Sequence, residues 1–107
     1  RELTGGDTGM TRSLIAEAHS SFVRDLADLV ALLPRFESRA MFNLVHRING
    51  GVRLLQVAQL MDICERIEFL CDQPEVDIEE VTENAQFIAS ELPAIIAVLA
   101  DMCVLDA

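Results

Sequence analysis

Apolar residues recur at steps of three and four along most of the chain, which is the period of an amphipathic α-helix. This pattern predicts long helices over about residues 8–33, 38–55, 57–72 and 77–104. No segment alternates apolar and polar residues in the way a half-buried strand does. Because short connections join long helices as antiparallel neighbours, the sequence predicts an all-α, up-and-down antiparallel four-helix bundle after a short N-terminal segment.

Local sequence signals place the ends of these helices. Asp7 is a candidate N-cap for the first helix, and Pro34 ends it because the residue before a proline is pushed out of the α region. Ser38 is a candidate cap for the second helix, and Asp77 with Glu80 forms a capping-box-like start for the fourth. At this length, residues 1–107 are expected to form a single domain with one core.

The charge and hydrophobicity of the chain argue against nucleic acids and membranes as binding partners. Eighteen acidic residues against eight basic ones give a formal charge of −10, which argues against nucleic-acid binding because that requires Lys and Arg to displace phosphate counterions. No apolar run is expected to reach the roughly 20 residues that span a bilayer, and no N-terminal segment has a signal-peptide layout. The domain is therefore expected to be cytoplasmic and to make no direct membrane contact.

The cysteines and histidines are the candidate ligands for a metal ion. Cys64 and Cys71 lie about 10 Å apart along one predicted helix, beyond disulfide reach, and are expected to be reduced and buried. A zinc site that combines them with Cys103 and a histidine is possible on paper. Neither His46 nor His19 follows a Glu-x-x-His pattern, and C-x-x-C-H is absent, so no metal or haem is expected. His19 lies near its helix's apolar stripe and is expected at the bundle boundary.

His46 is the polar residue of the second helix with the most distinctive placement. The apolar residues of that helix form one stripe about 100° wide: Met41, Leu44, Val45, Ile48, Val52 and Leu55. His46 lies about 150° from the centre of this stripe, so its imidazole is expected to face solvent. The residues expected to share its face, within about 60°, are Arg39, Asn49, Gly50 and Arg53.

Two features beside His46 favour chemistry on the imidazole. Gly50, one turn on, weakens the helix by about 1 kcal/mol relative to alanine, and Gly51 adds a similar penalty. Glycines in mid-helix indicate that another group needs to approach closely there. Arg39 and Arg53 lie two turns before and after the histidine, where they favour an incoming anion.

The segment LVHRINGGVRLLQVAQLMDICERIE resembles the core motif of histidine phosphotransfer (HPt) domains of multistep two-component phosphorelays. His46, Ile48 and Gly50 match the His-x-(Leu/Ile)-Lys-Gly part of that motif. The apolar helix that follows resembles the family pattern at Leu60, Ile63, Cys64, Ile67 and Glu68. The opening ELTGGD also resembles the start of such domains at the C-terminal end of hybrid sensor histidine kinases.

The resemblance implies that His46 accepts a phosphoryl group from a receiver-domain aspartyl phosphate and passes it to another receiver. Response-regulator receiver domains are the implied partners, and the receiver is expected to supply Mg²⁺ and its own lysine. This domain then needs no cofactor and acts as a phosphocarrier without ATP-dependent kinase activity. Docking is expected on the exposed face of the histidine helix, including Phe42 and Asn43, and on the adjacent 8–33 helix.

The sequence departs from the family pattern at two positions. Asn49 replaces the usual lysine, which is taken to help hold the phosphoryl group. Arg53 is expected to replace that charge, with Arg47 as a less well-directed substitute. Gln56 stands where many members have the glycine that ends the helix. The alternatives are a receiver-binding adaptor that accepts no phosphate and a generic helical scaffold.

Overall fold

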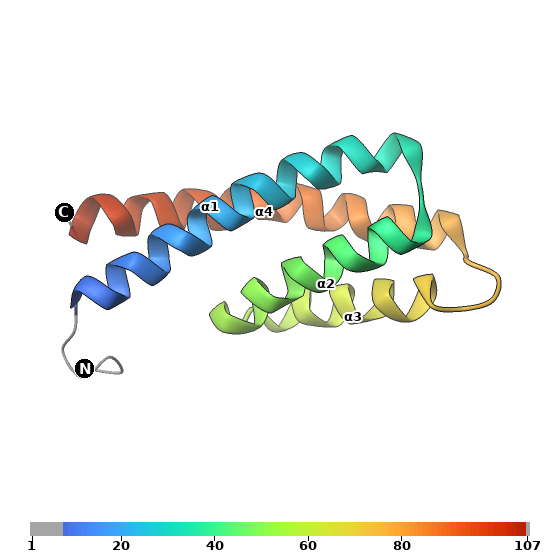
Figure 1. Ribbon diagram of the computed structural model, residues 1–107, viewed down its shortest axis with the longest axis horizontal. Helices are drawn as coiled ribbons and strands as arrows, with labels where there is room; N and C mark the ends of the chain where they lie inside the picture. The colour runs from blue at the N-terminus through green and yellow to red at the C-terminus, as the bar shows by residue number, and fades with distance from the viewer. Residues whose placement is uncertain (1–7, 107) are drawn as a thin grey trace.

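A computed structural model describes residues 8–106 of the chain and confirms the all-α prediction. The helices are α1 (Thr8–Leu32), α2 (Ser38–Leu55), α3 (Ala58–Cys71) and α4 (Ile78–Asp106), with a 3₁₀ turn over Leu33–Arg35 after α1 (Figure 1). No strand occurs within the described part of the chain. Asp7, the candidate cap of the first helix, lies outside the described residues.

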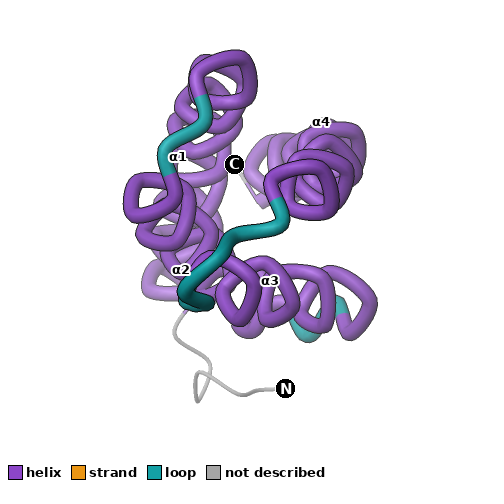
Figure 2. Tube along the Cα trace, turned by 90° about the vertical axis from the view of Figure 1, so that its right-hand side faces the viewer, coloured by secondary structure: helices purple, strands orange, loops and turns teal. Residues whose placement is uncertain are grey.

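The helices lie at the corners of a square in cross-section. Helix α1 contacts α2 and α4, and α3 contacts the same two helices, so α1 and α3 are diagonal (Figure 2). With 25 and 29 residues, α1 and α4 are longer than α2 and α3, which have 18 and 14. The α1–α4 pair therefore extends beyond the other two at the end where α1 begins and α4 ends, and the molecule measures 49 × 22 × 19 Å (Figure 1).

One apolar stripe from each helix forms the core, as the three- and four-residue spacing predicts. The most completely buried large side chains include Phe22 and Leu29 from α1, Ile48 from α2, Ile67 from α3 and Ile88 from α4. A second group of partly buried apolar side chains surrounds these and includes Ile15, Leu26, Phe42, Met61 and Ile95. Removing such side chains from water is the main force that holds α2 in place against its neighbours.

The start of α2 differs from the prediction that Ser38 caps it. Glu37 is the N-cap: its backbone is extended, and its carboxylate accepts a 2.8 Å hydrogen bond from the Ala40 N–H. Ser38 is the first residue of the helix. A carboxylate at this end also interacts favourably with the helix dipole. The predicted start of α4 is confirmed, because the Asp77 carboxylate accepts a 3.0 Å bond from the Glu80 N–H.

The end of α2 requires a left-handed residue, and here that residue is Gln56. Its φ of 59° and ψ of 41° are left-handed, and its N–H donates to the Arg53 carbonyl at 3.1 Å. The Val57 N–H donates to the Val52 carbonyl at 3.3 Å, which closes the last turn. The helix thus ends at the expected position without the glycine, although a side chain in this conformation is strained by about 1 kcal/mol.

Gln56→Gly is therefore expected to stabilise the fold. Glycine adopts the left-handed region without steric penalty, so the free energy of unfolding should rise by about 0.5–1 kcal/mol. Urea unfolding followed by circular dichroism measures this change. Gln59→Gly, at an exposed position inside α3, is the matched control and should lower stability by a similar amount. A destabilised Gln56→Gly variant would contradict this account of the helix end.

The prediction that no segment has the length and apolarity of a membrane span is wrong for helix α4. Residues Ile78–Val104 meet both criteria, and Pro93 lies inside the helix without ending it. In this fold α4 buries Val81, Ile88 and Leu92 against its neighbours. Only 17% of this apolar window is buried, so α4 is less covered than a typical core helix. One such helix is weak evidence, and it does not assign the domain to a membrane.

Candidate functional site

His46 lies in the middle of α2 with its side chain 72% exposed, in agreement with the helical wheel. One edge of the ring contacts α3: Nδ1 of His46 lies 3.2 Å from Oε1 of Glu68. The Glu68 side chain is only 18% exposed. The antiparallel packing of α2 and α3 brings these two residues together across 22 positions of the chain. The sequence analysis did not identify Glu68 as the partner of His46, because a pattern along one helix does not reveal contacts between helices.

The Glu68 contact selects one form of the imidazole. An ionised carboxylate only accepts hydrogen bonds, so the nitrogen facing Glu68 must be the one that carries the proton. In the neutral imidazole, this assignment leaves Nε2 of His46 with the free lone pair. An exposed ring with a nucleophilic Nε2 and a carboxylate behind Nδ1 is suited to covalent transfer chemistry.

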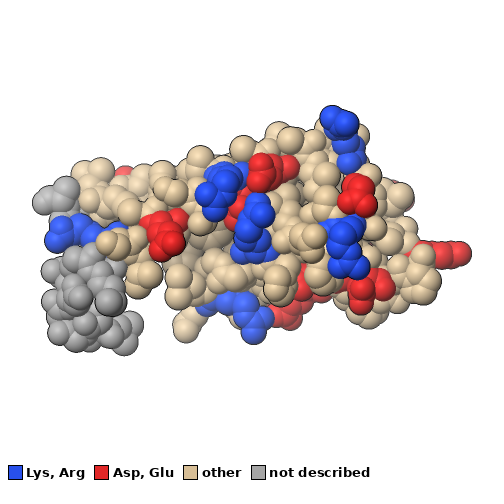
Figure 3. Space-filling view, viewed as in Figure 1, with Lys and Arg blue, Asp and Glu red and all other residues tan. Residues whose placement is uncertain are grey.

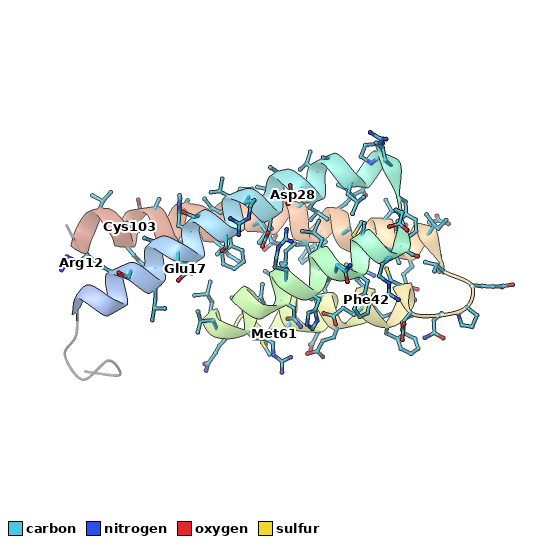
Figure 4. All side chains as sticks on the ribbon, viewed as in Figure 1. Arg12, Glu17, Asp28, Phe42, Met61 and Cys103 are labelled. Atoms are coloured by element: carbon cyan, nitrogen blue, oxygen red, sulfur yellow. The ribbon has the colours of Figure 1, made fainter. Side chains whose placement is uncertain are left out.

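Phe42 stacks against the histidine on the same side of α2. Its ring lies 6.2 Å from the His46 ring, centroid to centroid, and the two planes differ by 8°. The Arg39 guanidinium carbon lies 5.0 Å from the Phe42 centroid, within the range of a cation–π contact. Phe42 is partly buried and packs against the core, near where α2 and α3 lie side by side (Figure 4).

Arg47 points toward α1. Its Nε donates to Asp25 at 2.8 Å, and a terminal nitrogen donates to Asp28 at 3.1 Å. Asp25 is buried with a side chain that is 2% exposed, whereas Asp28 lies at the surface of α1 (Figure 4). Arg47 therefore joins α1 to α2 and neutralises a buried carboxylate, which is a structural role.

Arg53 is on the α3 side of the histidine face and forms a 3.1 Å ion pair with Glu65. Both side chains are more than half exposed, so the pair is weak and Arg53 can exchange partners. Basic and acidic groups alternate over the visible face of the molecule (Figure 3). Arg47 and Arg53 are each paired with an acid, whereas Arg39 contacts the Phe42 ring.

Asn49 is not on the exposed face, and this corrects the sequence prediction. Only 5% of the residue is exposed, and its Oδ1 is buried without a hydrogen-bond partner, as is Oε2 of Glu68. On the wheel Asn49 falls about 60° from His46, toward the side on which α3 covers the edge of α2. The periodicity of α2 describes one helix alone, so it does not reveal that a neighbouring helix buries Asn49.

The two glycines have different roles. A Cβ on Gly51 would lie 2.8 Å from the Phe22 ring of α1, so Gly51 allows the two helices to pack closely. A Cβ on Gly50 would meet nothing within 4 Å, which leaves open space one turn from His46. Gly50 also borders a groove of about 270 Å³ between α1 and α2, whose exposed apolar rim includes Leu14 and Leu54.

The cysteines are not arranged for metal binding or for reactivity. Cys64, Cys71 and Cys103 are all free, and the first two are buried as expected. Burial raises the pKa of Cys64 to about 12, assisted by the charges of Glu68 and Glu65, so its thiol stays protonated at neutral pH. Burial also raises the pKa of Cys71. Within the described residues, no three side chains of metal-ligating type converge.

The remaining sequence-predicted residues lie where the patterns place them. Asn43 is exposed on α2, on the side that faces α1, where it borders a shallow groove with Arg47. Arg39 is exposed but contacts Phe42, not the imidazole. His19 is partly buried on α1, as expected for a boundary histidine. The structure thus groups Arg39, Phe42 and Glu68 with His46, and it separates Arg47 and Asn49 from it.

Comparison with known proteins identifies the family. A family model described as the Hpt domain matches residues 12–102, which is most of the chain. No curated protein and no solved structure matches the chain. The matched region contains α2 and α3 completely and most of α1 and α4, and it includes the exposed His46. The chain belongs to the Hpt domain family, and its role is histidine phosphotransfer within two-component phosphorelay signalling.

Proposed function

We propose that Nε2 of His46 accepts a phosphoryl group from the aspartyl phosphate of a response-regulator receiver domain and passes it to a second receiver. The observation that supports this most strongly is the pairing of Nδ1 with Glu68 on a ring that is otherwise exposed. A convex helix face allows the active site of another protein to surround the nucleophile. An enclosed pocket would not.

The proposed transfer exchanges one phosphorus bond for another and requires no cofactor bound to this domain. The Nε2 lone pair attacks the phosphorus, the bond from phosphorus to the aspartyl oxygen breaks, and the aspartate leaves as a carboxylate. The proton on Nδ1 stays in place, so the phosphorylated ring carries a positive charge directly beside Glu68. Delivery to a second receiver is the reverse reaction. The receiver is proposed to supply the Mg²⁺ that neutralises the transferring oxygens.

The groove beside Gly50 is proposed to receive part of the receiver domain. Open space at Gly50, one turn from His46, allows a partner's backbone to approach the imidazole closely. The exposed apolar side chains of Leu14 and Leu54 border this groove and offer the receiver apolar surface to bury. Docking over α1 and α2 would place the receiver's aspartyl phosphate at Nε2.

Gly50→Gln is expected to slow transfer by at least about tenfold without harming the fold. The added side chain would occupy the open space, and a displacement of about 1 Å at the reacting atoms costs about 10²-fold in rate. Stopped-flow or quench-flow transfer from a phosphorylated receiver measures this rate. Gly50→Ala is the matched control and should raise helix stability by about 1 kcal/mol. Equal rates for the glutamine variant and the native protein would contradict the close approach.

Arg53→Ala is expected to slow transfer by about three- to tenfold. We propose that Arg53 leaves its exposed pair with Glu65 and contributes charge toward the transferring group in the absence of the family lysine. Arg66→Ala is the matched control, because Arg66 of α3 forms a similar ion pair at the surface with Glu80 of α4. Rates that fall equally in both variants would indicate a general charge effect and reject a specific role for Arg53.

The test of the proposed function is incubation with a labelled, phosphorylated receiver. A phosphocarrier gains label that is lost in acid, and it returns the label to a second receiver. The alternative, a receiver-binding adaptor, would bind the receiver and gain none. Asn49 replaces the lysine that is taken to help hold the phosphoryl group in this family, and this replacement is the observation that favours the adaptor. We further propose that the domain works in the cytoplasm, as part of a sensor histidine kinase and without ATP-dependent kinase activity of its own.

A further inference from the structure

Glu68 and Phe42 contact the imidazole of His46, and Arg39 contacts Phe42 from farther along the helix. The sequence analysis expects Phe42 to contact the receiver. We infer that Phe42, held in place by Arg39, is a positioning residue for His46 and not a docking contact for the receiver. Together with Glu68 it holds the ring so that Nε2 points outward. This inference rests on the proposed role of His46 as phosphoryl acceptor.

The stacking geometry constrains the ring plane. Residues 42 and 46 are one turn apart, so their side chains meet on the same side of α2. Their rings are nearly parallel, with an 8° angle between planes and 6.2 Å between centroids, as in the offset arrangement that aromatic pairs prefer. Phe42 restricts the tilt of the imidazole, while the Glu68 carboxylate restricts its rotation through Nδ1. Each contact fixes a movement that the other leaves free.

Arg39 completes the stack from the opposite direction along the helix. It precedes Phe42 by three residues, whereas His46 follows Phe42 by four, so Phe42 lies between the two along α2 and contacts both. The guanidinium lies 5.0 Å from the phenyl centroid, where the face of the ring attracts a cation. The Arg39 guanidinium contacts Phe42 and not the imidazole, so we assign its effect on His46 to the phenyl ring between them.

A docking role fits Phe42 less well than it fits the groove beside Gly50. Arg39 and His46 occupy the approaches to the phenyl ring, and Phe42 is partly buried against the core. Little of the ring therefore remains for a partner to cover. Leu14 and Leu54, by contrast, are 47% and 65% exposed beside open space. The groove with this exposed apolar rim lies on the α1 side of His46, and Phe42 lies on the α3 side.

The test compares two phosphodonors on the native domain and its variants. A phosphorylated receiver needs both docking and a positioned imidazole, whereas phosphoramidate has no protein surface and needs only the imidazole. In the latter reaction Nε2 bonds to phosphorus, the phosphorus–nitrogen bond of the donor breaks, and ammonia leaves. Phe42→Leu is expected to lower the maximal transfer rate from the receiver by about two- to tenfold. It should slow the phosphoramidate reaction similarly and leave the half-saturating receiver concentration unchanged.

Two further variants keep the inference testable if Phe42→Leu is unstable. Phe42→Tyr preserves the stack and should restore both rates. Arg39→Met changes an exposed residue and should lower both rates by about two- to fivefold. The upfield ring-current shift of the His46 ring protons should disappear in Phe42→Leu and return in Phe42→Tyr.

The outcomes separate this inference from the proposed function. If Phe42→Leu raises only the half-saturating receiver concentration and phosphoramidate reacts at the native rate, Phe42 is a docking residue and the inference is overturned. Unchanged rates in both Phe42→Leu and Arg39→Met would also overturn it. If the native domain takes no phosphoryl group from any receiver, the proposed function itself fails.

Discussion

His46→Gln should abolish phosphoryl uptake from a phosphorylated receiver, with a loss of at least about 10³-fold, and should leave the fold intact. The amide nitrogen of glutamine has no available lone pair, so no phosphorus–nitrogen bond forms. The side chain is 72% exposed, and substitutions at such positions change stability by about 0.5 kcal/mol or less. Retained label after gel filtration, with thermal unfolding as the check on folding, measures both effects.

His19→Gln provides the matched control for this substitution. His19 is the other histidine of the chain, and it lies partly buried on α1 without a part in the site. Its replacement should leave uptake within about twofold of the native value. If uptake survives in His46→Gln and disappears in His19→Gln, the acceptor has been assigned to the wrong helix.

Arg47→Ala is expected to destabilise the domain by about 2–3 kcal/mol. The carboxylate of Asp25 is 2% exposed and loses its 2.8 Å partner, which leaves a buried charge uncompensated. Breaking a buried pair on one side costs about 3–5 kcal/mol, and the half-exposed arginine reduces this figure. For a domain of this size the melting temperature should fall by about 10–20 °C.

Two companion variants identify the cause of that loss. Asp28→Asn removes the exposed partner of Arg47 and should change stability by less than about 1 kcal/mol. Asp25→Asn in the Arg47→Ala background removes the stranded charge and should recover part of the lost stability. An Arg47→Ala variant as stable as the native domain would show that water neutralises Asp25 and that Arg47 is not structural.

The sequence alone predicted the helices and their order because the apolar period is regular and the connections are short. Details that depend on backbone geometry were less predictable. Glu37 caps α2 where Ser38 was expected, since either residue type can accept the bond and the choice depends on the local turn. Gln56 ends the same helix in a left-handed conformation that sequence patterns assign to glycine. In both cases the position was right to within one residue.

The site was predictable only as far as one helix determines it. The exposure of His46 and the open space at Gly50 follow from the periodicity of α2. Contacts made across helices do not, so the sequence analysis missed the Glu68 partner and placed Asn49 on the surface. It likewise grouped Arg47 with the site, although the packing of α1 against α2 assigns that side chain to Asp25.

The most direct test of the account is to locate the phosphoryl group on the imidazole itself. The native domain, labelled with ¹⁵N in its histidine rings, would be phosphorylated by a receiver and studied by ³¹P and ¹⁵N NMR. The account predicts a phosphorus coupling at Nε2 of His46, with the proton retained on Nδ1 beside Glu68. Phosphorus on Nδ1, on another residue, or nowhere in the domain would contradict it.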